Sequence, residues 1–298
     1  MILSLWRIRI KAVSNMQGKE NVLLTIETLK DSFTKTEKKI ATFVVKNPQK
    51  VVYMSLTEVS DILKVSEGSI VRFCQKLGYT GFHPFKIALA VSENQESFSS
   101  SEFDFNSRDL SSLKNYVAQR HIDVIKNTSE FISEEILEAC VEKILTARTI
   151  LISGVGASGN TAHDAFYKFM RIGLNCKTSH DAHIQAMIAS ELREGDVLLA
   201  ISQSGSTLEI VDIADIARKG GATVIAITGY ARSPLARFAH HVLLTPTRES
   251  PFESGALRSK IAQLYVLELL FTAVFHRMEE KGRKFIERTA DSVAKWIY

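Results

Sequence analysis

The sequence predicts two domains, an all-α domain followed by an α/β domain built on a doubly wound, parallel, five-stranded sheet. Three observations lead to this prediction. The chain has 298 residues, 45% of them apolar, which is enough for one large core or two modest ones. Apolar residues recur at helical spacing as far as Leu89, whereas short apolar strands alternate with amphipathic helices from Thr149 onward. A serine-rich stretch separates the two patterns.

That stretch, SENQESFSSSEFDFNSRDLSS, carries little helical periodicity and is typical of a flexible linker. The first residues, MILSLWRIRIKAV, interrupt a short apolar run with three basic residues, so we interpret them as an extension that precedes a natural start at Met16. A segment that binds a surface is the alternative. The predicted divisions are an extension at 1–18, a helical domain at 19–91, a linker at 92–112 and an α/β domain at 113–298.

The net positive charge of the protein comes from the front of the chain. Residues 1–91 hold 14 Lys and Arg against 7 Asp and Glu, and the remainder holds 23 against 26. A basic front domain favours a polyanionic partner, although a solvated surface has the same composition.

The three cysteines, Cys74, Cys140 and Cys176, are widely spaced and form no CxxC pair, which argues against a disulfide framework and a thiolate zinc site. No apolar run approaches the roughly 20 residues of a membrane helix. We therefore expect a cytoplasmic protein that does not enter a membrane.

A helix-turn-helix pattern lies in the basic front, in SLTEVSDILKVSEGSIVRFCQKLGY (Ser55–Tyr79). Ser55 and Glu58 form a capping-box pattern that opens one helix, and Ser66 is placed to cap a second helix after a short turn. The spacing directs one face of each helix to the core. The residues expected to pack there are Val59, Ile62, Val65, Ile70, Phe73, Cys74 and Leu77.

The opposite face of the second helix carries small residues at its start and side chains that can form hydrogen bonds farther along, as a helix entering the major groove of DNA requires. An ordinary helical hairpin with a solvated face is the alternative. Lys64 occupies the turn where such motifs often have glycine, and a left-handed conformation there would cost about 1 kcal/mol. The predicted DNA-binding residues are Ser66, Gly68, Ser69, Arg72, Gln75 and Lys76.

The second domain alternates strands and helices, which predicts a parallel sheet covered on both faces. Two helices precede the sheet and a long apolar helix follows it. The predicted strands are Thr149–Gly154, Cys176–Thr178, Val197–Ile201, Thr223–Thr228 and Val242–Thr245, and the predicted flanking helices are Leu113–Ile125, Ser133–Leu145 and Leu257–Arg277.

The first strand ends in GVGASGN and runs into a helix expected at Thr161, which resembles a dinucleotide fingerprint. The acidic residue that should follow a second strand is not in a convincing position, since Asp181 lies too far away. We therefore predict no cofactor.

The third strand leads into AISQSGSTLE (Ala200–Glu209), whose hydroxyls and glycine could bind an anion without a lysine. Serines in loops are commonly turn formers. Here, however, Ser158 lies in the loop after the first strand, and both loops should open at the carboxyl edge of the sheet. A phosphate pocket is the favoured interpretation.

These features together resemble the RpiR-type bacterial transcriptional regulators, in which a helix-turn-helix precedes a sugar isomerase (SIS) domain of flavodoxin-like architecture. The resemblance covers Leu23 to Ile297 and is carried by SEGSIVRFCQKLGYTGFHPFK, AISQSGST and SGALRSKIAQLYVLELLF. It implies operator DNA, a phosphorylated sugar effector and a homodimer or homotetramer. It also implies that Ser202, Ser204 and Thr207 hold the phosphate, with Ser158 from the neighbouring loop. The phosphosugar-binding residues predicted in this way are Gly156, Ser158, Ser202, Gln203, Ser204, Gly205, Thr207 and Glu253.

A SIS domain can sense a sugar or transform it. Isomerisation needs a base beside the reacting carbons and an acid for ring opening, and Glu249, Glu253, His180 and His183 show no pairing in sequence that fixes such geometry. The attached helix-turn-helix favours an effector site. We therefore predict a non-enzymatic regulator of carbohydrate metabolism, with a phosphosugar isomerase or lyase as the alternative.

Overall fold

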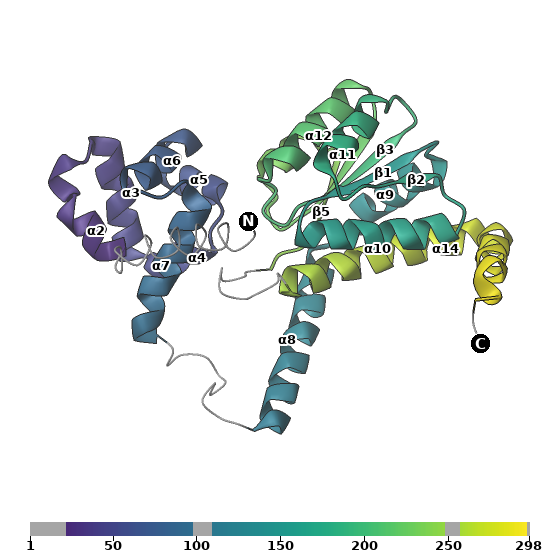
Figure 1. Cartoon of the computed structure of the whole chain (residues 1–298), viewed down its shortest axis with the longest axis horizontal. Coiled ribbons are helices and arrows are strands. Elements are labelled where there is room, and N and C mark those ends of the chain that lie inside the picture. Colours follow the sequence, from purple (N-terminus) through teal and green to yellow (C-terminus); the bar gives the residue numbers. More distant parts are fainter. Residues whose placement is uncertain (1–21, 98–108, 248–256, 297–298) are drawn as a thin grey trace, which may run out of the picture. The chain divides into compact units, whose positions relative to one another are not determined.

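The computed structural model describes residues 22–97, 109–247 and 257–296, which form two compact units that divide at residues 108 and 109 (Figure 1). Each unit is described by itself. The predicted extension at 1–18, the middle of the predicted linker and the predicted ligand Glu253 lie outside the described residues.

The first unit is helical and is organised around Phe73. The ring of Phe73 lies 5.4 Å from that of Phe33 and 6.3 Å from that of Phe85, both in edge-on contact. Such aromatic pairs stabilise a core beyond the area they bury. The elements are α2 (Val22–Thr28), η1 (Lys30–Ser32), α3 (Lys35–Lys46), α4 (Pro48–Tyr53), α5 (Leu56–Leu63), α6 (Glu67–Lys76) and α7 (Phe82–Ser97).

Helices α5 and α6 form the predicted helix-turn-helix. Ser55 and Glu58 cap α5 reciprocally, and the Ser66 hydroxyl accepts a hydrogen bond from the Ser69 amide at the start of α6. Lys64 ends α5 in the left-handed conformation, with φ 50° and ψ 49°. The predicted pair of helices with its caps is therefore confirmed, and Lys64 adopts the left-handed conformation that costs a non-glycine residue about 1 kcal/mol.

Two predictions for this unit were wrong in detail. Ile62 does not pack in the core, because its side chain is 50% exposed, whereas Val59 is buried and Val65 is partly buried against the core. The predicted linker is also too long at both ends, since α7 continues through Ser97 and α8 begins at Leu110.

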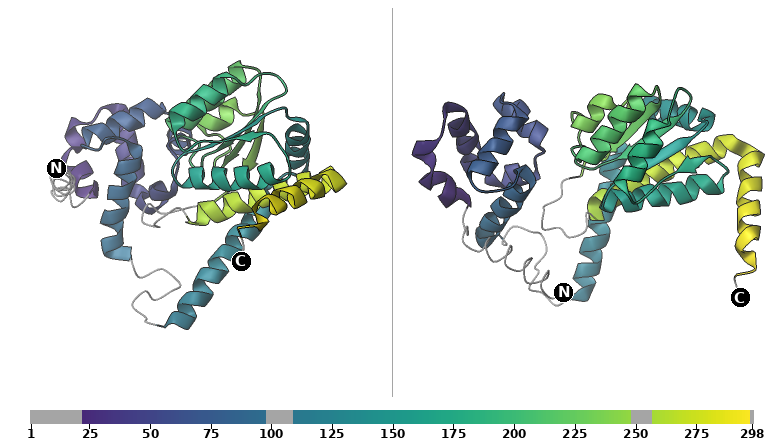
Figure 2. Two further views of the ribbon diagram at one scale, coloured as in Figure 1. Left: turned by 45° about the vertical axis from the view of Figure 1, so that its right-hand side comes forward. Right: turned by 45° about the horizontal axis from the view of Figure 1, so that its top comes forward.

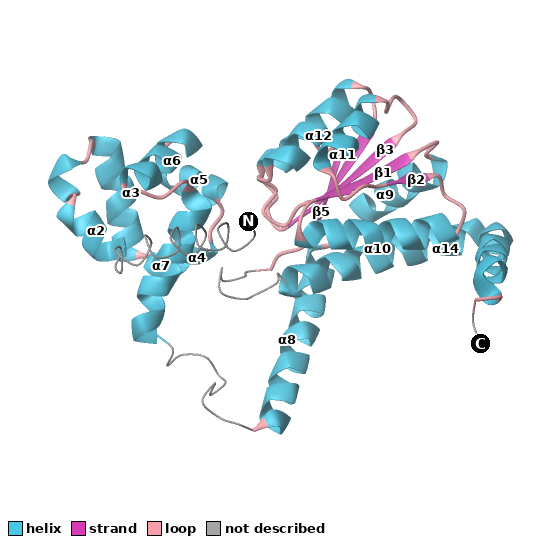
Figure 3. Ribbon diagram, viewed as in Figure 1, coloured by secondary structure: helices cyan, strands magenta, loops and turns pink. Residues whose placement is uncertain are grey.

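The second unit contains a five-stranded parallel sheet in the order β2-β1-β3-β4-β5, which is the flavodoxin-like order (Figure 3). The three central strands are buried almost throughout, as their continuous apolar sequences indicate. The predicted fold class is confirmed. The strands are β1 (Ile150–Gly154), β2 (Cys176–Lys177), β3 (Val197–Ile201), β4 (Thr223–Thr228) and β5 (His241–Leu244).

Helices cover both faces of this sheet (Figures 1 and 2). Side chains such as Ile152, Leu199 and Ile225 point into one core layer with α9, α10 and α14, whereas Leu198 and Ala226 point to the other face, against α11 and α12. The helices are α8 (Leu110–Phe131), α9 (Glu134–Thr146), α10 (Ala157–Arg171), α11 (Ala182–Ser190), α12 (Leu208–Lys219), α13 (Pro234–Phe238) and α14 (Leu257–Ala294).

Several helix ends differ from prediction. Helix α10 begins at Ala157 rather than Thr161, and α8 is longer at both ends. The predicted end of the long apolar helix at Arg277 lies two residues before a break at Glu279, where φ is 49°, and a second helical stretch, included in α14, continues from there to Ala294. Among the described helices, only α14 is long and apolar enough by composition to cross a membrane. Its buried residues Val266 and Leu270 belong to the core below the sheet, so the fold uses it as a core helix.

Candidate functional site

The two predicted ligand loops meet at the carboxyl edge of the sheet. Strands β1 and β3 are paired in register, with Gly154 opposite Ile201, so the loops that follow them emerge side by side. Gly156 has φ 60° and ψ −128°, a conformation suited to glycine, and it forms the turn that leads into α10. A Cβ on Gly154 would lie 2.5 Å from the Ser158 carbonyl oxygen. These glycines let the first turn of α10, with Ser158, close against the strand.

The loop between β3 and α12 holds its hydroxyls in two groups. Ser202 is buried, and its Oγ lies 3.2 Å from Thr207 Oγ1. Ser204 is exposed, and its Oγ accepts a hydrogen bond from the Ser206 amide at 3.2 Å. The predicted phosphate ligands therefore line one loop at different depths, with Ser204 on the solvent side.

Gly205 fixes the path of this loop. Its φ is 59°, and a Cβ there would lie 2.2 Å from Ser233 Oγ and 2.8 Å from Thr228 Oγ1. The Gly205 carbonyl also accepts a hydrogen bond from the Leu235 amide at 2.9 Å. Both the conformation and the crowding therefore require glycine at this position.

Gln203 fastens the loop from below. Its Nε2 donates to the Thr245 carbonyl at 2.9 Å and to Thr247 Oγ1 at 2.8 Å, while its Oε1 accepts from Thr245 Oγ1. Both side-chain N–H groups are thus engaged at the end of β5. The Gln203 side chain therefore positions the loop, and only the backbone of Gln203 is left for the predicted contact with a sugar.

The electrostatics of this edge suit an anion. Within the described residues, no side chain caps the first turn of α10 or of α12, so both helices present the positive ends of their dipoles here. None of the predicted ligands is a lysine or arginine. An anion would therefore be held by hydroxyls, backbone amides and helix dipoles.

The residues considered for isomerase chemistry are only partly described. His180 stacks on His163, with ring centroids 3.5 Å apart and the rings nearly parallel, while His183 is exposed at the start of α11. Glu249 and Glu253 lie outside the described residues. Across the part of the chain that the structure describes, no group of three or more His, Cys, Asp or Glu side chains could hold a metal ion.

The predicted DNA-facing surface lies on α6. Gly68, Arg72 and Gln75 are exposed, and Arg72 Nη2 donates to Ser69 Oγ at 3.2 Å, which holds the guanidinium over the start of the helix. Ser66 serves as the N-cap. The geometry thus presents one cation and several hydrogen-bonding groups on one helix face, the combination that reads base edges.

Lys76 differs from the other predicted DNA ligands. Its ammonium donates to Glu37 Oε2 at 2.9 Å and to the Ser32 carbonyl at 2.7 Å. The hydrogen bond from Lys76 is the main cause that holds the pKa of Glu37 below its usual value. Lys76 therefore ties α6 to the start of α3, a structural role that the sequence pattern did not show.

The opposite, amino edge of the sheet is charged. Arg148 Nε donates to Asp196 Oδ1 at 3.0 Å, and the Arg193 amide donates to Asp196 Oδ2 at 3.0 Å. Burial alone would raise the pKa of Asp196, but these hydrogen bonds outweigh it and hold the pKa below the usual value.

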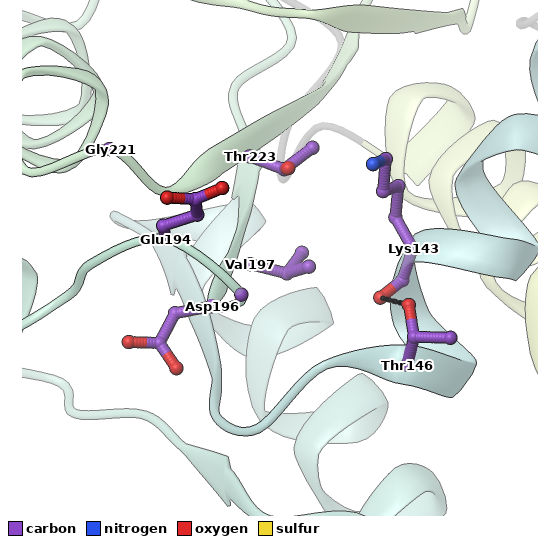
Figure 4. A pocket seen from close by; sticks show the side chains of 8 residues that line it. Lys143, Thr146, Glu194, Asp196, Val197, Gly221 and Thr223 are labelled. Atoms are coloured by element: carbon purple, nitrogen blue, oxygen red, sulfur yellow. Dashed lines mark hydrogen bonds between the residues drawn. The ribbon is translucent and has the colours of Figure 1, made fainter.

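A pocket of about 430 Å³ lies beside this ion pair at the amino edge, with Lys143 and Glu194 on opposite sides of it (Figure 4). Burial and the charge of Lys143 both lower the pKa of His241, at the start of β5. This pocket lies away from the predicted ligand loops, at the other end of the strands.

The pKa of each of the three cysteines is raised above its usual value. Burial raises the pKa of Cys74, Cys140 and Cys176 to about 12 in each case. At neutral pH the thiolate, which is the reactive form, is therefore scarcely populated.

Comparison with known protein families agrees with this architecture. Residues 20–96 match the helix-turn-helix domain of the rpiR family, and residues 143–273 match the SIS domain. An uncharacterized HTH-type transcriptional regulator of Caldanaerobacter subterraneus subsp. tengcongensis is 35% identical over 271 residues, 91% of this chain and 96% of the relative. Another, from Thermotoga maritima, is 34% identical over 259 residues, 86% of this chain and 92% of the relative.

Solved structures have similar folds. The Vibrio vulnificus NanR protein, complexed with ManNAc-6P, superposes with a TM-score of 0.81 at 28% identity, covering 93% of this chain and 99% of that chain. The sugar isomerase domain of an RpiR transcription factor from Sphaerobacter thermophilus has a TM-score of 0.55 at 22% identity, covering 60% of this chain and 98% of that chain, and supports the fold alone.

The fold and the relatives together define a transcriptional regulator that joins a helix-turn-helix to a SIS domain. The chain belongs to the rpiR family of these regulators. The resemblance drawn from the sequence is thereby confirmed.

Proposed function

We propose that this protein is a cytoplasmic, homo-oligomeric regulator of carbohydrate metabolism, whose affinity for operator DNA is set by a phosphorylated sugar or amino sugar. The observation that carries the proposal is the paired loops at the carboxyl edge, where hydroxyls and two uncapped helix starts converge. NanR, a structural neighbour over 93% of this chain, was solved with ManNAc-6P bound. A sugar phosphate is therefore the ligand class that we assign to this edge.

The sugar is proposed to act as a signal and to leave unchanged. Among the predicted ligands that the structure describes, the side chains are hydroxyls and one engaged amide, which bind an anion but do not provide a base of suitable pKa. A ligand changes operator affinity only if it binds two arrangements of the assembly unequally, and such coupling is typically about 1–3 kcal/mol.

Calorimetry with ManNAc-6P, other hexose and hexosamine phosphates, and their unphosphorylated forms tests the effector site. We expect a phosphorylated sugar to bind, its unphosphorylated form to bind much more weakly, and the double variant Ser204→Ala/Thr207→Ala to lose about 3 kcal/mol or more of binding free energy. Equal affinity for both forms would refute a phosphate site. NMR of the bound sugar after long incubation should show no conversion.

Selection from a random double-stranded DNA library tests the helix-turn-helix. Enriched sequences should be near-palindromic if the protein binds as a dimer. Arg72→Ala should cost about 1–3 kcal/mol against the selected sequence, with the fold intact. Lys76→Met is the informative companion, because the contacts with Glu37 and Ser32 predict a loss of thermal stability. Full operator affinity in Arg72→Ala at moderate salt would remove α6 as the reader.

A further inference from the structure

Two buried side chains behind Ser158 were not among the predicted ligands. Gln263 on α14 is 1% exposed and Thr161 on α10 is 2% exposed. The two helices lie side by side below the sheet (Figures 1 and 2). Thr161 Oγ1 donates to Gln263 Oε1 at 2.9 Å, and Gln263 Nε2 donates to Ser158 Oγ at 3.2 Å. The three side chains form one hydrogen-bonded series that ends at the predicted ligand site.

The series has a direction. A glutamine amide accepts at its oxygen and donates at its nitrogen, whereas a hydroxyl has a single hydrogen. Because Thr161 donates to Oε1, the Gln263 nitrogen faces Ser158. The Thr161 hydroxyl has a second acceptor, the Ala157 carbonyl, but that oxygen lies farther away, at 3.4 Å. Since both Thr161 and Gln263 are buried, water does not compete for these positions.

We propose that Gln263 is a positioning residue that makes Ser158 a hydrogen-bond donor to an anionic oxygen of the ligand, and that Thr161 holds Gln263 in the required orientation. Ser158 Oγ already receives a hydrogen from Gln263, so its own hydrogen points to another acceptor. Ser158 lies in the first turn of α10, where the helix dipole also favours negative charge. This inference rests on the proposed phosphosugar site. It explains in part why that site would prefer ligand groups that accept hydrogen bonds.

A double-mutant cycle between Ser158→Ala and Gln263→Glu tests the proposal in the full-length protein. The glutamate has the shape of glutamine but accepts at both oxygens when ionised, so Ser158 should donate to it and turn away from the ligand. With the tightest-binding phosphosugar of the panel that includes ManNAc-6P, we expect Gln263→Glu to weaken binding about tenfold at pH 8. In the Ser158→Ala background the same change should weaken it no more than about twofold.

The outcomes distinguish a positioning role of Gln263 from an effect of charge or of a disturbed fold, and both of these from the absence of a phosphosugar site. Equal losses in both backgrounds would show that the glutamate acts by charge or by disturbing the fold, which would overturn the role of Gln263. The pH dependence adds a second readout, because a protonated glutamate can donate to Ser158 again. The loss relative to wild type should therefore shrink at pH 5, and a constant loss would also contradict the proposal. If the wild type binds no phosphorylated sugar at all, the proposed function fails as well.

A milder pair of variants keeps the test available if Gln263→Glu does not fold. Thr161→Val removes the donor that orients the amide and should weaken binding about threefold, whereas Thr161→Ser keeps the hydroxyl and should bind as the wild type does. Equal affinity of the two variants, with melting temperatures that match, would contradict an orienting role for Thr161.

Discussion

The carboxyl and amino edges of the sheet are built from the same strands but use different chemistry. At the carboxyl edge, β1 and β3 lead into loops of hydroxyls and crowded glycines, where uncapped helices begin. At the amino edge, Asp196 is held by Arg148 and by a backbone amide, and Lys143 and Glu194 line an open pocket. The comparison teaches that this fold places the proposed binding site and the charged anchor of Asp196 at opposite ends of the same strands. Substitutions at the amino edge should therefore leave phosphosugar affinity unchanged.

The largest contrast is expected between two glycines with positive φ. Gly205, at the carboxyl edge, is crowded by Ser233, whereas a Cβ on Gly195, at the amino edge, would meet nothing within 4 Å. Gly205→Ala should therefore cost about 2–4 kcal/mol of unfolding free energy, from strain plus overpacking, and should abolish phosphosugar binding. Gly195→Ala should cost only the strain, about 1 kcal/mol, and retain affinity. Chemical denaturation measures the unfolding free energy and calorimetry measures the affinity. Equal losses of unfolding free energy in the two variants would contradict the expected difference between the two edges.

A smaller effect is expected at the buried carboxylate. Asp196→Asn should lower the unfolding free energy by about 2 kcal/mol at pH 7 without changing phosphosugar affinity, because it removes charge-assisted hydrogen bonds from the amino edge. The folded-state pKa of Asp196 is lowered, so its contribution is present at neutral pH and is lost as pH falls through that pKa.

The Asp196→Asn variant should consequently lose less stability than the wild type on acidification below about pH 4. Asp215→Asn is the matched control, because Asp215 forms an exposed pair with Lys219 on α12 that contributes only about 0.3 kcal/mol. Equal losses of unfolding free energy in the two variants would show that the buried carboxylate of Asp196 contributes no more to stability than an exposed one.

The smallest effect concerns the pocket at the amino edge. Lys143→Gln should leave phosphosugar affinity unchanged, since Lys143 lies at the end of the strands opposite to the ligand loops. It should raise the pKa of His241, because the charge of Lys143 adds to burial in lowering it. An NMR titration of the histidines measures the shift, with Lys219→Gln as a control. A change in affinity as large as that of Ser204→Ala/Thr207→Ala would show that the two edges communicate.

Most of the fold could be predicted because its strongest signals are local. The strands Val197–Ile201 and Thr223–Thr228 have the predicted ends, since buried parallel strands are continuous apolar runs. The predicted end of the apolar helix at Arg277 lies close to the break at Glu279. The helical stretch after the break was not predicted, because it is largely exposed and carries no buried apolar stripe. Helix α8 was predicted too short because much of its surface is exposed and its first turns carry no buried stripe.

The site was predictable only where its residues are contiguous. Their hydroxyl and glycine content predicts the loop Ser202–Thr207 and the turn at Gly156, and the strand order places the two next to each other. Gln263 could not be found in this way, because it meets Ser158 across 105 residues and lies in the middle of an apolar helix. Lys76 was assigned to DNA from helical spacing alone, which does not show its partner Glu37, 39 residues earlier.

The three native thiols, two buried and one partly buried, make this protein a convenient host for site-specific labels. All three native cysteines have pKa values near 12, so a maleimide should modify them far more slowly than an exposed thiol. One cysteine introduced at exposed Gln75 and another at exposed Asn115 would then carry a donor and an acceptor fluorophore, one on each unit. Energy transfer between them would follow the distance between α6 and the second unit, molecule by molecule, as a phosphosugar of the proposed class is added.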